Sequence, residues 1–230
     1  MTPEEIRWLL EGAKGERLED AFLVLLHTGL RIGELLGLTW DAVDLAKGTL
    51  TVRQALHEEN GRVYLGDVKT KAARRTITLP NVAVEALRRW RRRQAEERLR
   101  AGAAWQNETN LLFTSRTGGP LRRSNVDGRD LARVIRKARQ KAAEAYEKAG
   151  MSRSEAQAAA AKLLEGVTLH SFRHTHAALL IAQGVDIMTV SRRLGHENIR
   201  ITLDLYGHLL PGQDEKAAAA LDGFLANLAR

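Results

Sequence analysis

One region of the chain, residues 49–79, alternates apolar and polar side chains with a period of two, and this limits the folds that the whole sequence can adopt. The alternating segments are residues 49–52, 63–65 and 76–79. Gly61 and the stretch 69–75 provide the turns between them. The pattern predicts a small three-stranded antiparallel sheet. Since no other region has convincing strand character, the predicted fold class is mainly α with this one small antiparallel sheet.

Apolar residues recur with the helical period through most of the remaining chain. Thr2, Pro3 and Glu5 form the capping pattern that opens a helix, and Gly29 ends a second, more buried one. The helices expected after the first cover residues 18–27, 31–38, a stretch from 81 onward, about 124–148, a stretch from 152 onward and about 213–228. No linker rich in proline, glycine and serine divides the chain, and no internal repeat is visible. We therefore expect a single domain over residues 1–230.

The charge balance narrows the class of partner. Lys and Arg number 36 against 28 Asp and Glu, which leaves a net charge of +8. Such a surplus favours a polyanion, either nucleic acid or an anionic membrane face, although a soluble arginine-rich surface explains it about equally well. The window 81–140 alone holds an excess as large as that of the whole chain. That asymmetry is typical of a nucleic-acid footprint, with a solvated helix face as the alternative.

Two absences in the sequence bear on its compartment. There is no cysteine, which excludes disulfides and thiolate metal sites. The first residues contain no apolar core of a signal peptide, and no apolar run approaches the length of a membrane span. We therefore expect a soluble, cytoplasmic protein that does not contact a membrane.

The stretch 170–208 concentrates side chains that can carry chemistry. His170 and Arg173 stand three apart on a predicted helix, a Leu-Gly-His triplet ends at His196, and Tyr206 follows. Arginine forks match the geometry of phosphate oxygens, and a phenol with a pKa near 10 can attack phosphorus if a proton acceptor and positive charge lie nearby. The combination indicates a site that grips a phosphate and attacks it.

Each of these residues also has an ordinary structural explanation. His170 and Arg173 could cap and solvate the first turn of a helix. His196 could stabilise a helix C-terminus, and Tyr206 could be a core aromatic whose hydroxyl finds a backbone partner. A metal site is a further alternative, less favoured because Arg173 would stand beside the metal. Its ligands would come from His170, His174, His176, His196 and His208.

Four segments together resemble the catalytic domain of the tyrosine recombinase (phage integrase) family. They are HTGLRIGELLGLTW (27–40), TKAARRTITLP (70–80), LHSFRHTHAALL (169–180) and LGHENIRITLDLYGHLLP (194–211). They extend over nearly the whole chain in the order of the family. Any one of them would be a weak signal, but four in order at compatible spacing are specific.

The resemblance implies a role for each matching residue and requires no metal or other cofactor. Arg31 and Arg173 would hold the oxygens of the scissile phosphate, and Lys71 would protonate the leaving 5′-oxygen. His170 and His196 would assist proton transfer. Tyr206 would attack the phosphorus and form a 3′-phosphotyrosine. Glu34 would bind Arg31 without contacting the phosphate itself.

The resemblance also implies partners. The partner is double-stranded DNA, so we expect the protein at the nucleoid, and its further contacts are assigned to Lys69, Arg74, Arg75, Arg122 and Arg123. Only about thirty residues precede Arg31, so we expect the family's separate N-terminal DNA-binding domain to be absent from residues 1–230. The apolar stripe over about 213–228 could dock on the core of its own chain, which is the usual case, or on a neighbouring copy, and we expect the neighbouring copy. The alternatives are a non-catalytic DNA-binding module and, less favoured, a histidine-based metal-dependent nuclease.

Overall fold

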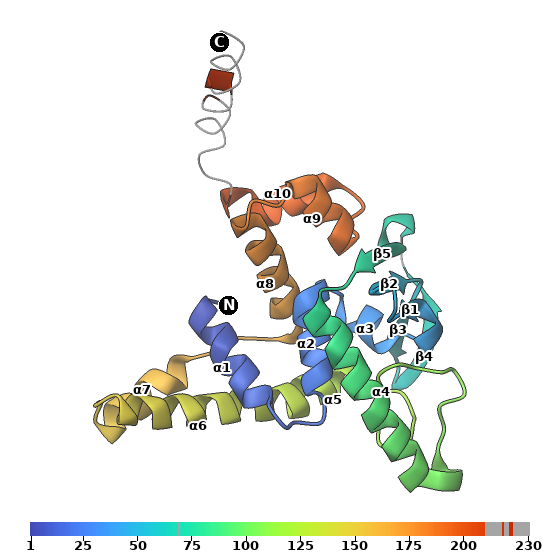
Figure 1. The fold of residues 1–230 in the computed structure, drawn as a ribbon, viewed down its shortest axis with the longest axis horizontal. Coiled ribbons are helices and arrows are strands. Elements are labelled where there is room, and N and C mark those ends of the chain that lie inside the picture. The colour runs from blue at the N-terminus through green and yellow to red at the C-terminus, as the bar shows by residue number, and fades with distance from the viewer. Residues whose placement is uncertain (69, 210–217, 219–220, 223–230) are drawn as a thin grey trace.

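The computed structural model describes residues 1–68, 70–209, 218, 221 and 222, and its strands lie together at one side of the helices (Figure 1). The helices are α1 (Pro3–Ala13), α2 (Glu19–Thr28), α3 (Ile32–Leu36), α4 (Asn81–Ala101), α5 (Arg123–Asn125), α6 (Ala132–Lys148), α7 (Arg153–Lys162), α8 (Leu169–Ala182), α9 (Ile187–Leu194) and α10 (Ile199–Tyr206). The strands are β1 (Val43–Asp44), β2 (Thr49–Val52), β3 (Gln54–Glu59), β4 (Arg62–Asp67) and β5 (Arg75–Thr78). The predicted fold class, mainly α with a small antiparallel sheet, is confirmed. None of the described helices is long and apolar enough to cross a membrane.

The pairing of the strands differs from the prediction in one respect. β2 pairs with β5, with Leu50 opposite Ile77, as expected, but the third strand of this sheet is β1. The predicted strand 63–65 lies in β4, which pairs with β3 in a separate hairpin. The chain remains extended after β2, and the next segment, β3, pairs with β4 across a tight turn. β3 ends in two glutamates, so its sequence lacks the alternation of apolar and polar residues that predicts a strand.

The helix boundaries follow the predicted capping residues. Thr2 and Glu5 form a capping box at the start of α1, and Ser152 and Glu155 form another at the start of α7. Gly29 ends α2 in the left-handed conformation, with φ 65°. The helix predicted over 124–148 is present, but a π-helical segment, Val126–Leu131, joins α5 to α6. The predicted helix over 213–228 falls almost entirely outside the described residues.

Two buried apolar clusters hold the elements together. The larger one is centred on α2, where Phe22, Val24 and Leu25 are fully buried against α4 and α8. The smaller one joins α8, α9 and α10 and consists of Ala177, Ile181, Val190, Leu194 and Tyr206. In Figure 1, α8 leads from the centre of the molecule toward α9 and α10. Tyr206 is therefore held by a compact helical unit attached to the main core through α8.

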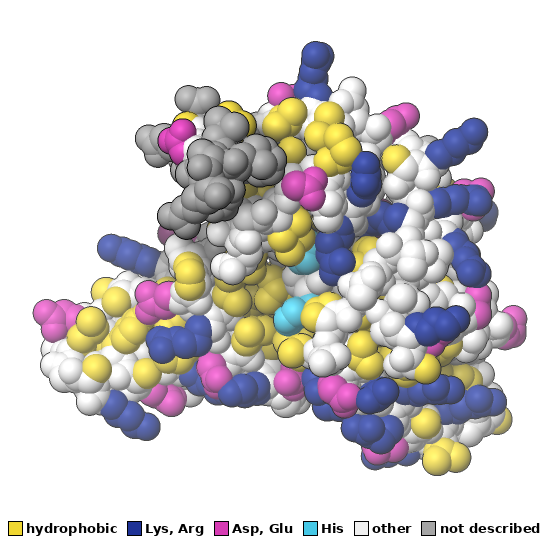
Figure 2. Space-filling view, turned by 45° about the horizontal axis from the view of Figure 1, so that its top comes forward, with side chains coloured by type: hydrophobic (Ala, Val, Ile, Leu, Met, Phe, Trp, Pro, Cys, Tyr) yellow, Lys and Arg dark blue, Asp and Glu magenta, His cyan; other side chains and the backbone are white. Residues whose placement is uncertain are grey.

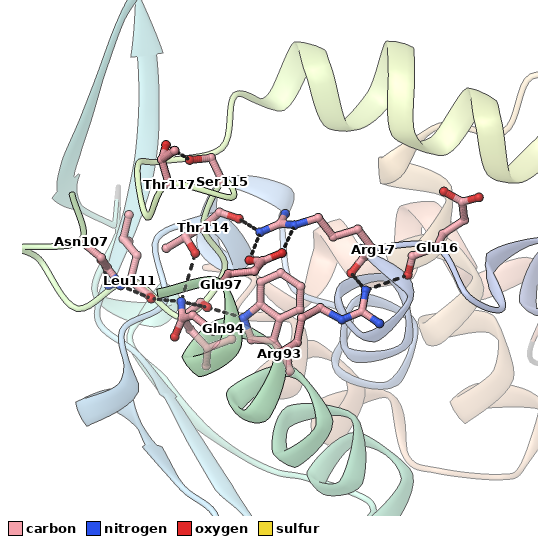
Figure 3. A network of polar contacts seen from close by, with 12 residues as sticks. Glu16, Arg17, Arg93, Gln94, Glu97, Asn107, Leu111, Thr114, Ser115 and Thr117 are labelled. Carbon is pink, nitrogen blue, oxygen red and sulfur yellow. Dashed lines mark hydrogen bonds and ion pairs between the residues drawn. The ribbon is translucent and has the colours of Figure 1, made fainter. Parts of the chain in front are cut away.

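A polar network fastens α4 to the loop that follows it (Figure 3). Arg17 makes two hydrogen bonds to Glu97, at 2.7 and 2.6 Å, and a third to the carbonyl of Thr114. The Gln94 amide donates to the carbonyls of Leu111 and Leu112. Part of the basic surface of α4 is used in the same way, since Arg89 pairs with Asp20 and Arg93 donates to backbone carbonyls. Some of the charge excess in the window 81–140 is thus structural.

Candidate functional site

Arg31 stands at the N-terminus of α3, directly after the turn that ends α2. The Arg31 backbone N–H donates to Glu34 Oε2 at 2.9 Å, and the guanidinium donates to Glu34 Oε1 at 3.0 Å. The Glu34 side chain is 3% exposed, whereas that of Arg31 is 44% exposed. The carboxylate therefore fixes the base of an arginine whose outer face remains open.

Glu34 binds a second arginine, Arg75 on β5. Arg75 donates to both carboxylate oxygens of Glu34, at 3.3 and 2.9 Å, and its Nε donates to the carbonyl of Arg193 at 2.6 Å. Burial works to raise the pKa of Glu34, but the hydrogen bonds and charges of Arg75 and Arg31 outweigh it and lower that pKa, so Glu34 is ionised. The side chain of Arg75 is only 7% exposed. Glu34 and the carbonyl of Arg193 therefore hold the Arg75 guanidinium inside the fold, and a contact of Arg75 with DNA stays a prediction.

Arg173 lies one helical turn inside α8 and is 2% exposed. Its Nη1 donates to the carbonyl of Gly29 and its Nη2 to the carbonyl of Leu194, both at 2.7 Å. Burial and the positive charge of Arg31 lower the pKa of Arg173 to about 9, which still leaves it charged at neutral pH. Arg173 therefore joins the turn before Arg31 to the turn before His196.

His196 follows Gly195, which ends α9 in the left-handed conformation with φ 68°. A Cβ at Gly195 would lie 2.7 Å from Nη1 of Arg75, so this position requires glycine on two counts. His196 Nδ1 hydrogen-bonds the hydroxyl of Thr202 at 2.8 Å. Burial, together with Arg173 and Arg31, lowers the pKa of His196 to about 4, so the ring is neutral at physiological pH.

Tyr206 ends α10 and is 5% exposed, with its ring in the small helical core. Burial raises the pKa of its hydroxyl, and the positive charge of Arg173 partly opposes this. The hydroxyl lies 2.6 Å from Nδ1 of His174, a residue that the sequence indicated only as a metal ligand. The His174 ring in turn stands edge-on to that of His170, with centroids 4.5 Å apart.

A hollow of about 570 Å³ lies beside these groups. Arg31, Arg123 and His170 line it together with Thr70, Ala73 and apolar side chains of α3 and β3. Burial, followed by the charges of His174, Arg173, Arg31 and Arg123, lowers the pKa of His170. Figure 2 shows histidine side chains at the floor of a depression in this face of the molecule.

The β3–β4 hairpin forms one wall of the hollow because α3 presents glycines toward it. A Cβ at Gly33 would lie 2.9 Å from the carbonyl of Leu56, and one at Gly37 would lie 2.6 Å from the backbone N of the same residue. Only glycine permits so close an approach of backbone to helix. The Gly-x-x-x-Gly spacing beside Arg31 thus sets the position of the hairpin.

The structure separates the predicted basic contacts into distinct groups. Lys71 is exposed in a short turn next to Thr70 and Ala73, at the rim of the hollow, and Arg123 lines the hollow itself. Arg74 pairs with Asp67 at 2.9 Å. Arg122 donates to Glu58 and to the carbonyl of Gly61, which ties it to the β3–β4 hairpin. Lys69 lies outside the described residues.

The described histidines of the metal alternative are held by separate hydrogen bonds or lie outside any set of metal ligands. His176 is buried, with Nδ1 at 2.9 Å from the carbonyl of Leu26 and Nε2 accepting from Arg193. His174 and His196 are directed to Tyr206 and Thr202. Among the side chains that the structure describes, no group of three or more His, Asp or Glu is arranged to hold a metal ion.

Comparisons with known proteins point to one family. Residues 1–212 match the model of the phage integrase family. The chain is 34% identical to the tyrosine recombinase XerC-like protein of Caldanaerobacter subterraneus, over 96% of this chain and 53% of that relative. It is 27% identical to the ICEBs1 integrase of Bacillus subtilis, over 97% of this chain and 54% of that protein. The chain thus spans about half the length of these curated relatives.

A solved structure shares the fold. The Tn1549 transposon integrase, in complex with transposon right end DNA, superimposes with a TM-score of 0.72 at 24% sequence identity. The match covers 96% of this chain and 64% of that one.

Proposed function

Because the chain belongs to the phage integrase family, we propose that it is the catalytic domain of a site-specific DNA recombinase that cuts and rejoins one strand through Tyr206. The observation that carries this proposal is the set of contacts around Arg173, whose guanidinium donates to the carbonyls of Gly29 and Leu194, each two residues before Arg31 and His196 respectively. The next residue on α8, His174, contacts the Tyr206 hydroxyl.

The two arginines would bind the non-bridging oxygens of the scissile phosphate. Arg173 uses one hydrogen on each terminal nitrogen for the carbonyls of Gly29 and Leu194, and a guanidinium has further N–H donors beyond these. Only one side of the Arg31 guanidinium contacts Glu34, and its outer side remains exposed. Planar forks of this kind match phosphate geometry and stabilise the charge that builds up during phosphoryl transfer. Loss of one such stabiliser typically costs about 3–4 kcal/mol in barrier.

In the proposed reaction the Tyr206 oxygen attacks the phosphorus as the bond to the 5′-oxygen breaks. The enzyme is left with a 3′-phosphotyrosine, and Lys71 gives a proton to the leaving 5′-oxygen. His170 and His196 would assist by orienting the phosphate and moving protons. Since one phosphodiester replaces another, the strand can be rejoined without ATP.

Double-stranded DNA would lie over the hollow. Arg123 would meet a phosphate next to the scissile one, because it lines the same hollow as Arg31 and His170. Arg74 and Arg122 are already paired with Asp67 and Glu58, so their contribution would be smaller. Lys69 remains a proposed contact on its sequence position alone. Such binding would place the protein at the nucleoid.

The test is covalent capture from a pool of nicked duplexes with randomised sequence, since the target site is unknown. A nick beside the cleavage point lets the short freed strand diffuse away, which traps the intermediate. We expect DNA that stays attached to the protein in hot detergent, with and without EDTA. DNA binding without any adduct would favour the non-catalytic module, and loss of the adduct with EDTA would favour the metal-dependent nuclease.

We also propose that the segment 213–228 docks on a second copy of the chain. Its sequence places Ala217, Leu221, Phe224 and Leu228 at helical spacing. The unit formed by α8, α9 and α10 offers an apolar surface, with Leu179, Met188, Ile201, Leu203 and Leu205 all exposed. Deletion of residues 213–230 should therefore leave one copy on each DNA site where the full chain places several, as measured by light scattering. Equal assembly would contradict this.

A further inference from the structure

The Tyr206 hydroxyl has one described hydrogen-bond partner, and it is not one of the histidines that the family resemblance assigns. Nδ1 of His174 lies 2.6 Å from the Tyr206 oxygen, with the two ring centroids 5.7 Å apart. In the part of the chain that the structure describes, no hydrogen bond joins His170 or His196 to this hydroxyl. His174 is therefore the imidazole in contact with the reacting atom.

The contact is built into the fold. His174 lies on α8 one turn before Ala177 and two turns before Ile181, and these two apolar residues form the small core that holds the Tyr206 ring. Tyr206 is 5% exposed, so its ring has little room to turn away from α8. The same helix carries Arg173, which donates to the carbonyls of Gly29 and Leu194. The element that places the phosphate-binding arginine thus also places His174 against the phenol.

Burial and a neighbouring positive charge keep the His174 ring unprotonated. Burial, followed by the neighbouring Arg173, lowers the pKa of His174, so the ring is neutral at physiological pH. We assign the proton of the neutral His174 ring to Nε2, which leaves Nδ1 to accept a hydrogen bond from the phenol. This is the arrangement from which the proton of the phenol can transfer.

We propose that His174 is the general base for Tyr206. As the Tyr206 oxygen forms its bond to phosphorus, its proton passes to Nδ1 of His174 and the bond from phosphorus to the 5′-oxygen breaks. Rejoining runs in reverse, and the imidazolium returns the proton to the departing Tyr206 oxygen. This inference rests on the proposed function and adds a catalytic residue to it.

The rival explanation is that His174 only orients Tyr206. Asparagine separates the two roles, because its side-chain oxygen can occupy the place of Nδ1 and accept the hydrogen bond but cannot take up the proton. The test compares wild type, His174→Asn and His174→Ala in single-turnover adduct formation on the DNA sequence recovered from the covalent capture. His27→Asn, a change to a half-buried histidine of α2 whose Nδ1 bonds the carbonyl of Leu23, is the matched control.

A general base typically contributes about 100-fold to 10,000-fold in rate. We therefore expect both His174 variants to form the adduct at least about 100-fold more slowly than wild type, with DNA binding unchanged and His27→Asn near wild type. The ratio of variant to wild-type rate should rise about tenfold per pH unit toward pH 10, because the phenol then ionises unaided.

The outcomes are distinguishable. If wild type forms no adduct, the proposed function fails. If wild type reacts and His174→Asn stays within a few fold of it, His174 orients Tyr206 and is not the base. A slow His174→Asn whose rate relative to wild type does not change with pH would equally overturn the inference.

Discussion

Arg75 and Glu34 form a buried two-point ion pair that connects β5 to the helix carrying Arg31. The Arg75 side chain is 7% exposed and that of Glu34 is 3% exposed. The same arginine also donates to the carbonyl of Arg193, just before the Leu-Gly-His turn. A single cation thus couples the first arginine of the site to the segment that presents His196.

Replacement of Glu34 by glutamine should destabilise the fold and the site together. The change leaves Arg75 buried without a counter-charge and frees Arg31, and removal of one partner of a buried pair typically costs about 3–5 kcal/mol. Urea unfolding would measure this loss. The matched control is Glu96→Gln, which breaks only an exposed pair with Arg100 and should change stability by less than about 0.5 kcal/mol. Similar midpoints for the two variants would argue against a structural role of the Arg75–Glu34 pair.

Stability should fall as the pH drops from about 6.5 to about 4. Burial lowers the pKa of His176 and of His196 to about 4 in the folded protein, whereas an unfolded histidine titrates near 6.5. The unfolded chain therefore binds more protons in this window, and protonation favours unfolding. For the buried His176, the difference amounts to about 3 kcal/mol.

Unfolding curves across this pH window test the assignment. His176 bonds the carbonyl of Leu26 and accepts from Arg193, so protonation would break the second contact. His176→Gln should lower the free energy of unfolding at pH 7. It should also make this free energy fall less steeply at lower pH, because close to one proton fewer is taken up on unfolding. Parallel pH curves for wild type and variant would contradict the account.

Gly195→Ala should cost more than an ordinary glycine substitution in the left-handed region. Gly195 has φ 68°, and a Cβ there would lie 2.7 Å from the Arg75 guanidinium. Gly184 has φ 78° and no atom within 4 Å of such a Cβ, so Gly184→Ala measures the backbone cost alone, about 1–2 kcal/mol. We expect Gly195→Ala to exceed this control and also to slow adduct formation. Equal losses of stability would show that Arg75 adjusts freely.

Arg123→Gln should weaken DNA binding about equally for all sequences. A lost phosphate contact lowers the dependence of log Kd on log salt concentration by about one unit. Arg153→Gln provides the control, because it lies at the start of α7, at the end of the molecule away from the sheet in Figure 1. Titrations at several salt concentrations would give both slopes. A slope for Arg123→Gln equal to that of wild type would show that Arg123 does not contact a DNA phosphate.

Short motifs in the sequence indicated which side chains belong to the candidate site. Arg31 lies at the start of α3, Arg173 one turn inside α8, His196 just after α9 and Tyr206 at the end of α10. The contacts that join these segments, such as that of Arg173 with the carbonyl of Gly29, depend on the packing of α8 against α2, and only the structure could supply them.

Two features could not be read from the sequence for the same reason. Arg75 stands in a run of cations, and nothing in that run distinguishes the arginine that turns inward to Glu34. His174 differs from its neighbours only through contact with Tyr206, which is distant in sequence. Hydrophobic periodicity locates helices and strands, but it does not say which polar side chain meets which.

The most direct measurement of the central claim is the identification of the residue that bears the DNA. Mass spectrometry of protease-digested adduct should place the nucleotide on the peptide containing Tyr206, and Tyr206→Phe should form no adduct while it still binds DNA. The protein has three tyrosines, so Tyr64→Phe and Tyr146→Phe are matched controls that should react like wild type. A nucleotide found on any other residue, or an adduct that persists in Tyr206→Phe, would contradict the account.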